Sequence, residues 1–339
     1  ANLNPTRSWM TSLIADFLEA GTKNDKTAYV PELLPRGWEL IKHLLQRAGD
    51  GKASLTDPMT HALNTEKGRA IGAMYNHALR VCRLAAQSNQ SVEQAWTTLE
   101  PVFDSEIVKC REANFEFSTL SASYIANIEF MSHKWLVANV KRLFPVEYPT
   151  NFKAALGGLA YATPTRAIYR LLSSNGILEA GLEVKLGDSR SRERIIEYIC
   201  LAYLWGDENL DAPLMSRVVS GGLDDIQNAA EFFWRVHGEK LSSEQVERVL
   251  AFWAKALEWA QAESEAPARL LSRLSHLAPY LTKLDERAKG LLLCVVPYVH
   301  TNHSTGQMIT ELARLVDSNP AVTIELLERM FEVSTPSYD

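Results

Sequence analysis

One glycine-containing run, Gly51-Lys52-Ala53-Ser54, could in principle bind a phosphate. A phosphate-binding loop has the form GxxxxGK[ST], in which the glycines let backbone N–H groups surround the phosphates and the lysine reaches them. Here Gln46 stands where the first glycine belongs, and Ala53 stands where the hydroxyl belongs. No GxGxxG run follows a strand-like pattern either. We therefore expect no nucleotide and no other cofactor in this chain.

Two short clusters have residue types that bind metals. His300 and His303 are spaced so that both could ligate one ion from a helix end. However, no cysteine or further histidine lies near them, and a cationic residue at a helix C-terminus is expected from the helix dipole alone. Asp224 and Asp225 follow two glycines, where carboxylates favour the first turn of a helix for the same reason. We expect no metal site.

Catalytic signatures are also missing. The chain has eight histidines but no Gly-x-Ser-x-Gly run to place a nucleophilic serine, so we expect no catalytic residue. Arg190, Arg192 and Arg194 could bind phosphates or an acidic partner. Because Glu193 and Glu197 are interleaved with them, a solvated helix start explains them better. The net charge of −6 and the pI near 5.8 argue against nucleic acid as the main partner.

The elements around these residues are predicted to be helices. Apolar fractions of 46% and charged fractions of 22% are typical of a folded protein. The spacing of Trp9, Leu13 and Phe17 predicts one helix, and capping-box residues predict another that begins at Val92. Trp135 and Trp253 lie in apolar runs and are expected in the core, whereas Trp205 and Trp259 are candidates for exposure. One extended piece is expected at residues 182–186.

The second half of the chain predicts consecutive helices of about 12 to 20 residues joined by short polar segments. Their expected starts are Ser189, Asp211, Leu223, Ser243, Pro267, Asp285, Thr305 and Pro320. Offsets of about 42 and 35 residues are close to those of HEAT and tetratricopeptide pairs, although no side-chain signature repeats. The predicted fold is therefore all-α, an irregular α-solenoid of helical hairpins. Pro145 and Pro149 suggest a division into residues 1–149 and 150–339.

The segment from Thr56 to Arg83 has the clearest local signals. Asp57 before Pro58 predicts an N-cap followed by proline in the first turn. Asn64 and Thr65 predict a second cap, and Gly68 lies in the first turn of a longer helix, where a missing side chain lets another backbone approach. Apolar residues from Ile71 onward recur with helical spacing, so one face of this helix is expected to be buried.

This pattern, Asp57-Pro58, Ala62-Leu63-Asn64 and Lys67-Gly68-Arg69-Ala70, resembles a segment in the C-terminal sensor region of bacterial antiviral STAND NTPases and of related defence proteins with sirtuin-like effectors. The match covers about a tenth of the chain. The resemblance implies a sensor that binds a large protein, such as a phage structural or packaging protein, and relays binding to an upstream NTPase and effector. It also implies that the chain is a fragment, and oligomerisation would use the missing domains. Arg69 would order the junction with those domains, or would simply be a surface arginine on a packed helix.

The function that the sequence favours is therefore a non-catalytic, ligand-sensing module. The alternative is a general scaffold of tetratricopeptide or HEAT type that binds a host peptide, and an enzyme with scattered site residues remains a third possibility. No apolar run reaches the roughly 18 residues of a membrane span, and the N-terminus lacks a signal-peptide pattern. Four widely spaced cysteines in apolar contexts predict reduced, buried thiols. A cytoplasmic location without membrane contact is expected.

Overall fold

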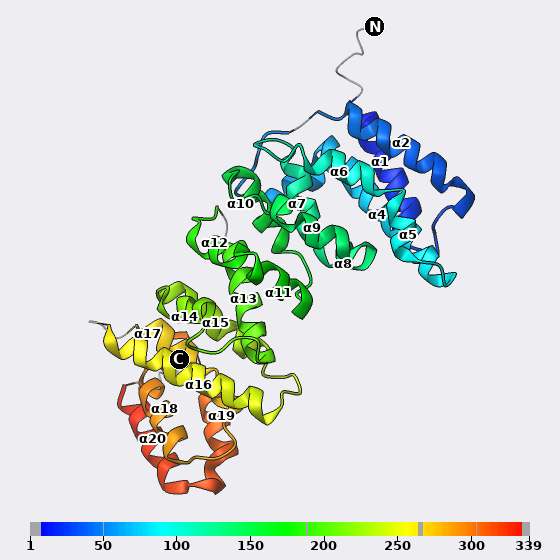
Figure 1. Ribbon diagram of the computed structural model, residues 1–339. Coiled ribbons are helices and arrows are strands. Elements are labelled where there is room, and N and C mark those ends of the chain that lie inside the picture. Colours follow the sequence, from blue (N-terminus) through cyan, green and yellow to red (C-terminus); the bar gives the residue numbers. More distant parts are fainter. Residues whose placement is uncertain (1–7, 50, 188, 264–266, 303, 334–339) are drawn as a thin grey trace. The chain divides into compact units, whose positions relative to one another are not determined.

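The computed structural model of the chain describes residues 8–49, 51–187, 189–263, 267–302 and 304–333. Within these residues the fold is all-α, with 20 α-helices and no strand (Figure 1). The chain forms two compact units, residues 1–195 and 196–339. The boundary predicted at 149/150 lies immediately after Pro149, the first residue of a helix. None of the described helices is both long and apolar enough to cross a bilayer.

The first unit contains the following helices, with η denoting 3₁₀ turns: α1 Ser8–Lys23, η2 Pro31–Leu33, α2 Leu34–Arg47, α3 Pro58–Asn64, α4 Glu66–Gln87, α5 Val92–Thr97, α6 Glu100–Ile107, α7 Phe115–Ser123, α8 Ile125–Met131, α9 His133–Leu143, α10 Pro149–Leu159, α11 Arg166–Ser174 and α12 Ile177–Glu183. Helix α13, Ser189–Trp205, contains the boundary between the units. The second unit continues with α14 Pro213–Ser220, α15 Leu223–Arg235, α16 Ser243–Ala262, α17 Ala268–Ser275, η3 Ala278–Tyr280, α18 Glu286–Val295, η4 Val296–Asn302, α19 Thr305–Leu315, η5 Val316–Ser318 and α20 Pro320–Val333.

Helix α4 is the centre of the first unit. Fifteen of its 22 residues are buried, because α1, α2, α3, α5, α7 and α8 all pack against it (Figure 1). Tyr75 on α4 stacks on Tyr124 with ring centroids 4.6 Å apart, and its hydroxyl donates to Ser121 Oγ over 2.6 Å. A hydroxyl buried in a core needs such a partner. Trp135 is also buried, as the sequence predicts.

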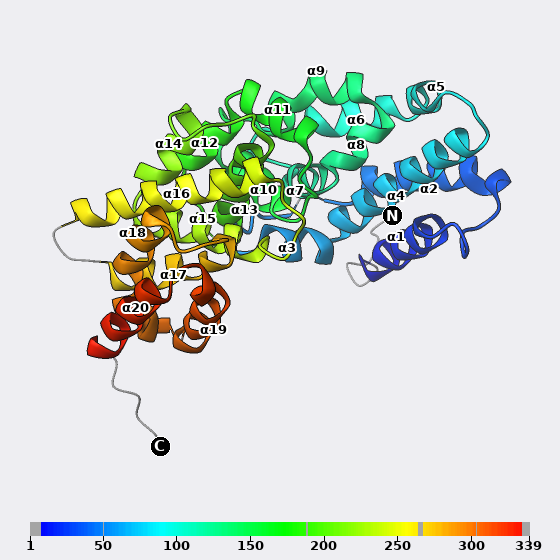
Figure 2. The ribbon, with the colours of Figure 1, turned by 90° about the horizontal axis from the view of Figure 1, so that it is seen from below.

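The second unit has its core between α15, α16, α17, α18 and α20. Trp253 and Phe233 are fully buried there, so the prediction of a core tryptophan at residue 253 is confirmed. Helix α16 contacts α14, α15, α17 and α18, and α18 contacts α20 (Figure 2). The Ser242 hydroxyl and the Gln245 side chain form a complete capping box at the start of α16. Two reciprocal hydrogen bonds therefore fix where this helix begins.

One predicted element needs correction. Residues 182 and 183 end helix α12, so the extended piece expected at residues 182–186 is wrong. Thr165 caps α11, and its hydroxyl accepts the N–H of Ile168 over 3.2 Å. Pro149, which suggested a division of the chain, lies in the first turn of α10. Proline lacks only an N–H that the first turn does not use, so it starts helices here rather than ending them.

Candidate functional site

The motif residues Asp57 and Asn64 delimit the short helix α3. The Asp57 carboxylate accepts the N–H of Thr60 over 3.0 Å, and this hydrogen bond lowers the pKa of Asp57 below its usual 3.8. Asn64 is the last residue of α3, and its side chain donates to the carbonyl of Thr60 over 2.8 Å. The cap of α4 is made by Thr65, whose hydroxyl accepts the N–H of Gly68 over 3.0 Å. Asp57 therefore caps the start of α3, and Asn64 is its last residue.

Lys67 and Gly68, in the first turn of α4, contact three neighbouring helices. Lys67 forms an ion pair with Glu106 of α6, with Nζ and Oε2 2.9 Å apart, and donates to the carbonyl of Leu45 in α2. Gly68 lies against α3, where a Cβ would come within 1.6 Å of the Ala62 carbonyl oxygen. Side chains of any kind are therefore excluded there. The first turn of α4 is the point at which α2, α3 and α6 are fixed to the central helix.

Arg69 connects the same turn to α1. Its guanidinium pairs with the carboxylate of Asp16, and the two side chains are 32% and 43% exposed. A pair this exposed contributes about 0–1 kcal/mol to stability on its own. The pair is of interest for its position, because Asp16 lies at the edge of a large apolar surface on α1.

That surface is an apolar stripe along α1. Five large side chains of this helix are exposed: Trp9 by 58%, Met10 by 43%, Leu13 by 55%, Ile14 by 37% and Phe17 by 70%. At 100° per residue they span an arc of about 140°. The opposite face, with Ala15, Leu18 and Thr22 buried, packs on α4. We call these five residues the α1 stripe.

The α1 stripe is comparable in size to the largest apolar patch on a typical monomer. Its side chains together expose on the order of 500 Å² of mostly apolar area, whereas the largest patch on a typical monomer is about 300–600 Å² and is often functional. Covering such an area would contribute on the order of 10 kcal/mol before the costs of association are subtracted. The arrangement can therefore hold an apolar partner surface, and it brings no catalytic group with it.

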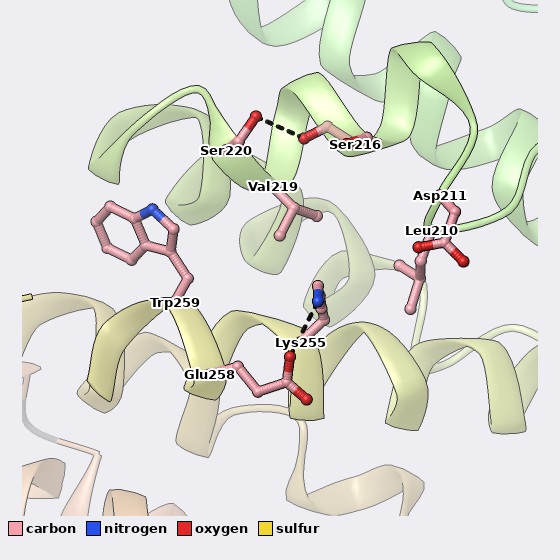
Figure 3. A pocket seen from close by; sticks show the side chains of 8 residues that line it. All are labelled: Leu210, Asp211, Ser216, Val219, Ser220, Lys255, Glu258 and Trp259. Carbon is pink, nitrogen blue, oxygen red and sulfur yellow. Dashed lines mark hydrogen bonds and ion pairs between the residues drawn. The ribbon is translucent and has the colours of Figure 1, made fainter. Parts of the chain in front are cut away.

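A pocket of about 360 Å³ lies in the second unit, between α14 with the segment before it and α16 (Figure 3). It is lined by Leu210, Asp211, Ser216, Val219, Ser220, Lys255, Glu258 and Trp259. In Figure 3 the Trp259 indole projects from α16 toward the α14 side, and Lys255 lies between the carboxylates of Glu258 and Asp211. Lys255 Nζ is 3.0 Å from Glu258 Oε2. This hydrogen bond is the main reason that the pKa of Lys255 is raised above 10.5.

The described histidine and aspartate residues that the sequence offered as metal ligands lie on different elements. His300 is exposed at η4, and His303 lies outside the described residues. Asp224 and Asp225 lie in the first turn of α15, as expected. In the described ranges no three His, Cys, Asp or Glu side chains converge as a metal site would require. The Gly51 N–H donates to the Glu116 carboxylate over 3.1 Å, so an anionic group already lies against the backbone of the phosphate-loop-like run.

The arginines of α13 are more structural than the sequence suggests. Arg192 donates to the carbonyl of Leu182, and Arg194 donates to the carbonyl of Ala160 over 3.1 Å. These carbonyls lie at the C-terminal ends of α12 and α10, where backbone acceptors lack helical partners. The expectation of a simply solvated helix start is therefore wrong for these two residues. The guanidinium of Arg190 lies 4.9 Å from the ring centroid of Tyr161.

Cysteine environments agree in part with the prediction. All four thiols are free; Cys82, Cys110 and Cys200 are buried, and Cys294 is half-buried. Burial raises the pKa of Cys82 to about 12 and raises that of Cys200 as well. Thiols in this state are poor nucleophiles at neutral pH.

Sequence reasoning missed Lys67, Glu106 and the pocket on α16. Lys67 lies within the motif, but its partner Glu106 is 39 positions away, so no local spacing reveals the pair. The pocket has a weak signal, because Lys255, Glu258 and Trp259 share a helix surface at i, i+3 and i+4. Comparison of the chain with protein-family models, with curated proteins and with solved structures found no match.

Proposed function

We propose that this chain is a non-catalytic helical module that recognises a protein partner through the α1 stripe. The observation that carries the proposal is the exposure of Trp9, Leu13 and Phe17 on one face of a helix whose other face is packed. Aromatic anchors of this kind dominate binding energy in protein interfaces. A partner that presents an apolar helix or groove would remove these side chains from water.

In its specific form, the proposal is a sensor of an antiphage defence protein in which the helices stack as an irregular solenoid. The partner is then a large phage structural or packaging protein, and binding is relayed to an NTPase or effector. The resemblance of residues 57–70 to the sensor region of STAND NTPases supports this form. The pairing of Arg69 with Asp16 supports it further, since it joins that segment to the helix that carries the stripe.

The experiment is a pull-down of individually co-expressed phage structural and packaging proteins with the full chain as bait. The test variant is Leu13→Asp with Phe17→Asp. The matched control is Ile324→Asp with Phe331→Asp, which places the same charges on exposed side chains of α20 in the other unit. We expect one phage protein to be captured by the wild type and the control, and lost from the stripe variant. Failure of the wild type with every phage protein, or equal capture by both variants, would refute the proposal.

A general scaffold that binds a host peptide is the second candidate. The pocket between α14 and α16 favours it, because about 360 Å³ is near the lower end of the range for ligand pockets and suits a single side chain. The two candidates differ in the surface they use. A peptide ligand whose binding survives the α1 stripe variant would favour the scaffold.

A further inference from the structure

We infer that the pocket between α14 and α16 is a binding site for an arginine side chain of a partner polypeptide. The site lies in the second unit and does not depend on the α1 stripe. Its apolar walls are the Trp259 indole, Leu210 and Val219, and its polar groups come from Asp211, Lys255 and Glu258 (Figure 3). An arginine has an aliphatic stem and a planar cationic end, which are the two features that such a lining can accommodate.

The charge of the pocket selects a cation. Asp211 and Glu258 contribute two negative charges, and protonated Lys255 contributes one positive charge, so the pocket carries about one net negative charge at neutral pH. Lys255 is already hydrogen-bonded to Glu258, and Asp211 also attracts it. A phosphate or carboxylate ligand would have to displace Glu258 and approach Asp211. An anionic ligand is therefore disfavoured.

A ligand cation can replace Lys255 as the partner of the Glu258 carboxylate. The two side chains are 66% and 46% exposed, and surface pairs of this kind contribute little to stability. An arriving guanidinium can take over the Glu258 carboxylate while Lys255 turns into solvent. Asp211 is exposed, and within the described part of the chain its carboxylate makes no hydrogen bond or ion pair. It therefore remains available as a second acceptor.

The remaining groups favour arginine over lysine. The Trp259 indole is half-buried and forms one wall, so a flat guanidinium can lie over its face as a cation–π contact. The Ser220 hydroxyl donates its hydrogen to the carbonyl of Ser216 over 2.8 Å. Its oxygen is then left as an acceptor beside the pocket. A guanidinium has five N–H donors in a fixed fork and can use several such acceptors at once, whereas an ammonium cannot match this geometry.

The test is a titration of the ¹⁵N-labelled full chain followed through the indole N–H signal of Trp259, which is assigned with Trp259→Phe. The probe is N-acetyl-arginine amide, and N-acetyl-citrulline amide is the uncharged probe of the same shape. We expect a saturable shift with arginine in the millimolar range and at least tenfold weaker binding of citrulline. Inorganic phosphate should not shift the signal.

Variants of exposed residues test the charge argument without risk to the core. Asp211→Asn should weaken arginine binding at least threefold, and Lys255→Gln should strengthen it because a competing cation is removed. Glu239→Gln, which changes the same charge at an exposed position outside the pocket lining, should leave binding unchanged. The α1 stripe variant should also bind arginine normally, so failure of the proposed function would not affect this result. Equal shifts with citrulline, binding of phosphate, or no response of Trp259 to arginine would overturn the assignment.

Discussion

The buried ion pair between Lys67 and Glu106 offers the sharpest test of how the first unit is held together. Their side chains are 2% and 3% exposed, and Nζ lies 2.9 Å from Oε2. The two residues differ in how many other polar partners they have. Glu106 also pairs with Lys109 over 2.6 Å and accepts from Asn114 over 3.0 Å, whereas among the residues that the structure describes Lys67 donates besides only to the carbonyl of Leu45.

This difference predicts the order of two substitutions. Removing one partner of a buried pair costs about 3–5 kcal/mol, because the other charge is left without compensation. Glu106→Gln removes the carboxylate that compensates the Lys67 ammonium and leaves it with neutral acceptors, the Leu45 carbonyl and the new amide oxygen, so its cost should lie near the upper value. Lys67→Met leaves Glu106 with Lys109 and Asn114, so its cost should lie near the lower value. The double variant should cost less than the sum of the two single variants.

Hydrogen exchange of the full chain, read by mass spectrometry, measures these costs locally. At about 1.4 kcal/mol for each factor of ten, α4 amides should exchange about 100-fold faster or more in either single variant. Peptides from α16 in the second unit provide an internal reference that should not change. A larger acceleration of α4 exchange by Lys67→Met than by Glu106→Gln, or less than tenfold acceleration by both variants, would contradict this prediction.

Three further predictions concern α4 and its neighbours. Burial lowers the pKa of His77 from 6.5 to about 4. The unfolded chain therefore binds more protons between these pH values, and the free energy of unfolding should fall by about 3 kcal/mol as the pH drops from 6.5 to 4. Thermal melts across this pH range should show the loss of stability, and His77→Phe should largely abolish it. Gly68→Ala places a Cβ against the Ala62 carbonyl and should lower the melting temperature, while Gly290→Ala, which meets nothing within 4 Å in α18, should gain about 0.5–1 kcal/mol. Arg69→Gln should change the melting temperature little yet weaken capture of the partner in the pull-down; normal capture would separate Arg69 from the stripe.

Local signals in the sequence predicted most helix starts in the second half. Helices α13, α15, α16, α19 and α20 begin at the predicted residues, and the predicted starts Pro267 and Asp285 are the N-caps of α17 and α18. These signals are local because a cap is made by side chains within three residues of the orphan N–H groups. Prolines were less informative. Pro35, Pro101 and Pro149 all lie in first turns, and proline as a helix breaker and proline as a helix starter have the same local sequence pattern.

The sequence could not predict which face of each helix packs against the rest of the unit, and the reason is physical. Periodicity shows that Trp9, Leu13 and Phe17 share a face, but a helix is amphipathic whether its apolar face meets a core or a partner. In α1 the buried residues that face α4 are instead Ala15 and Leu18. The candidate pocket is a similar case, because its lining comes from residues 210–220 and 255–259, whose approach depends on how the second unit packs.

The motif and the α1 stripe meet at Asp16, which gives the weak Arg69 pair a larger role than its exposure suggests. In the free chain, water screens the two charges and the pair adds little. A partner that covers Trp9 and Leu13 would exclude water from the adjacent edge, where Asp16 lies, and the attraction between the charges rises as the local dielectric falls. Binding at the stripe would then tighten the connection between α1 and the first turn of α4. Because Lys67 and Gly68 of that same turn contact α2, α6 and α3, a partner on α1 would act on the part of the unit where five helices are joined.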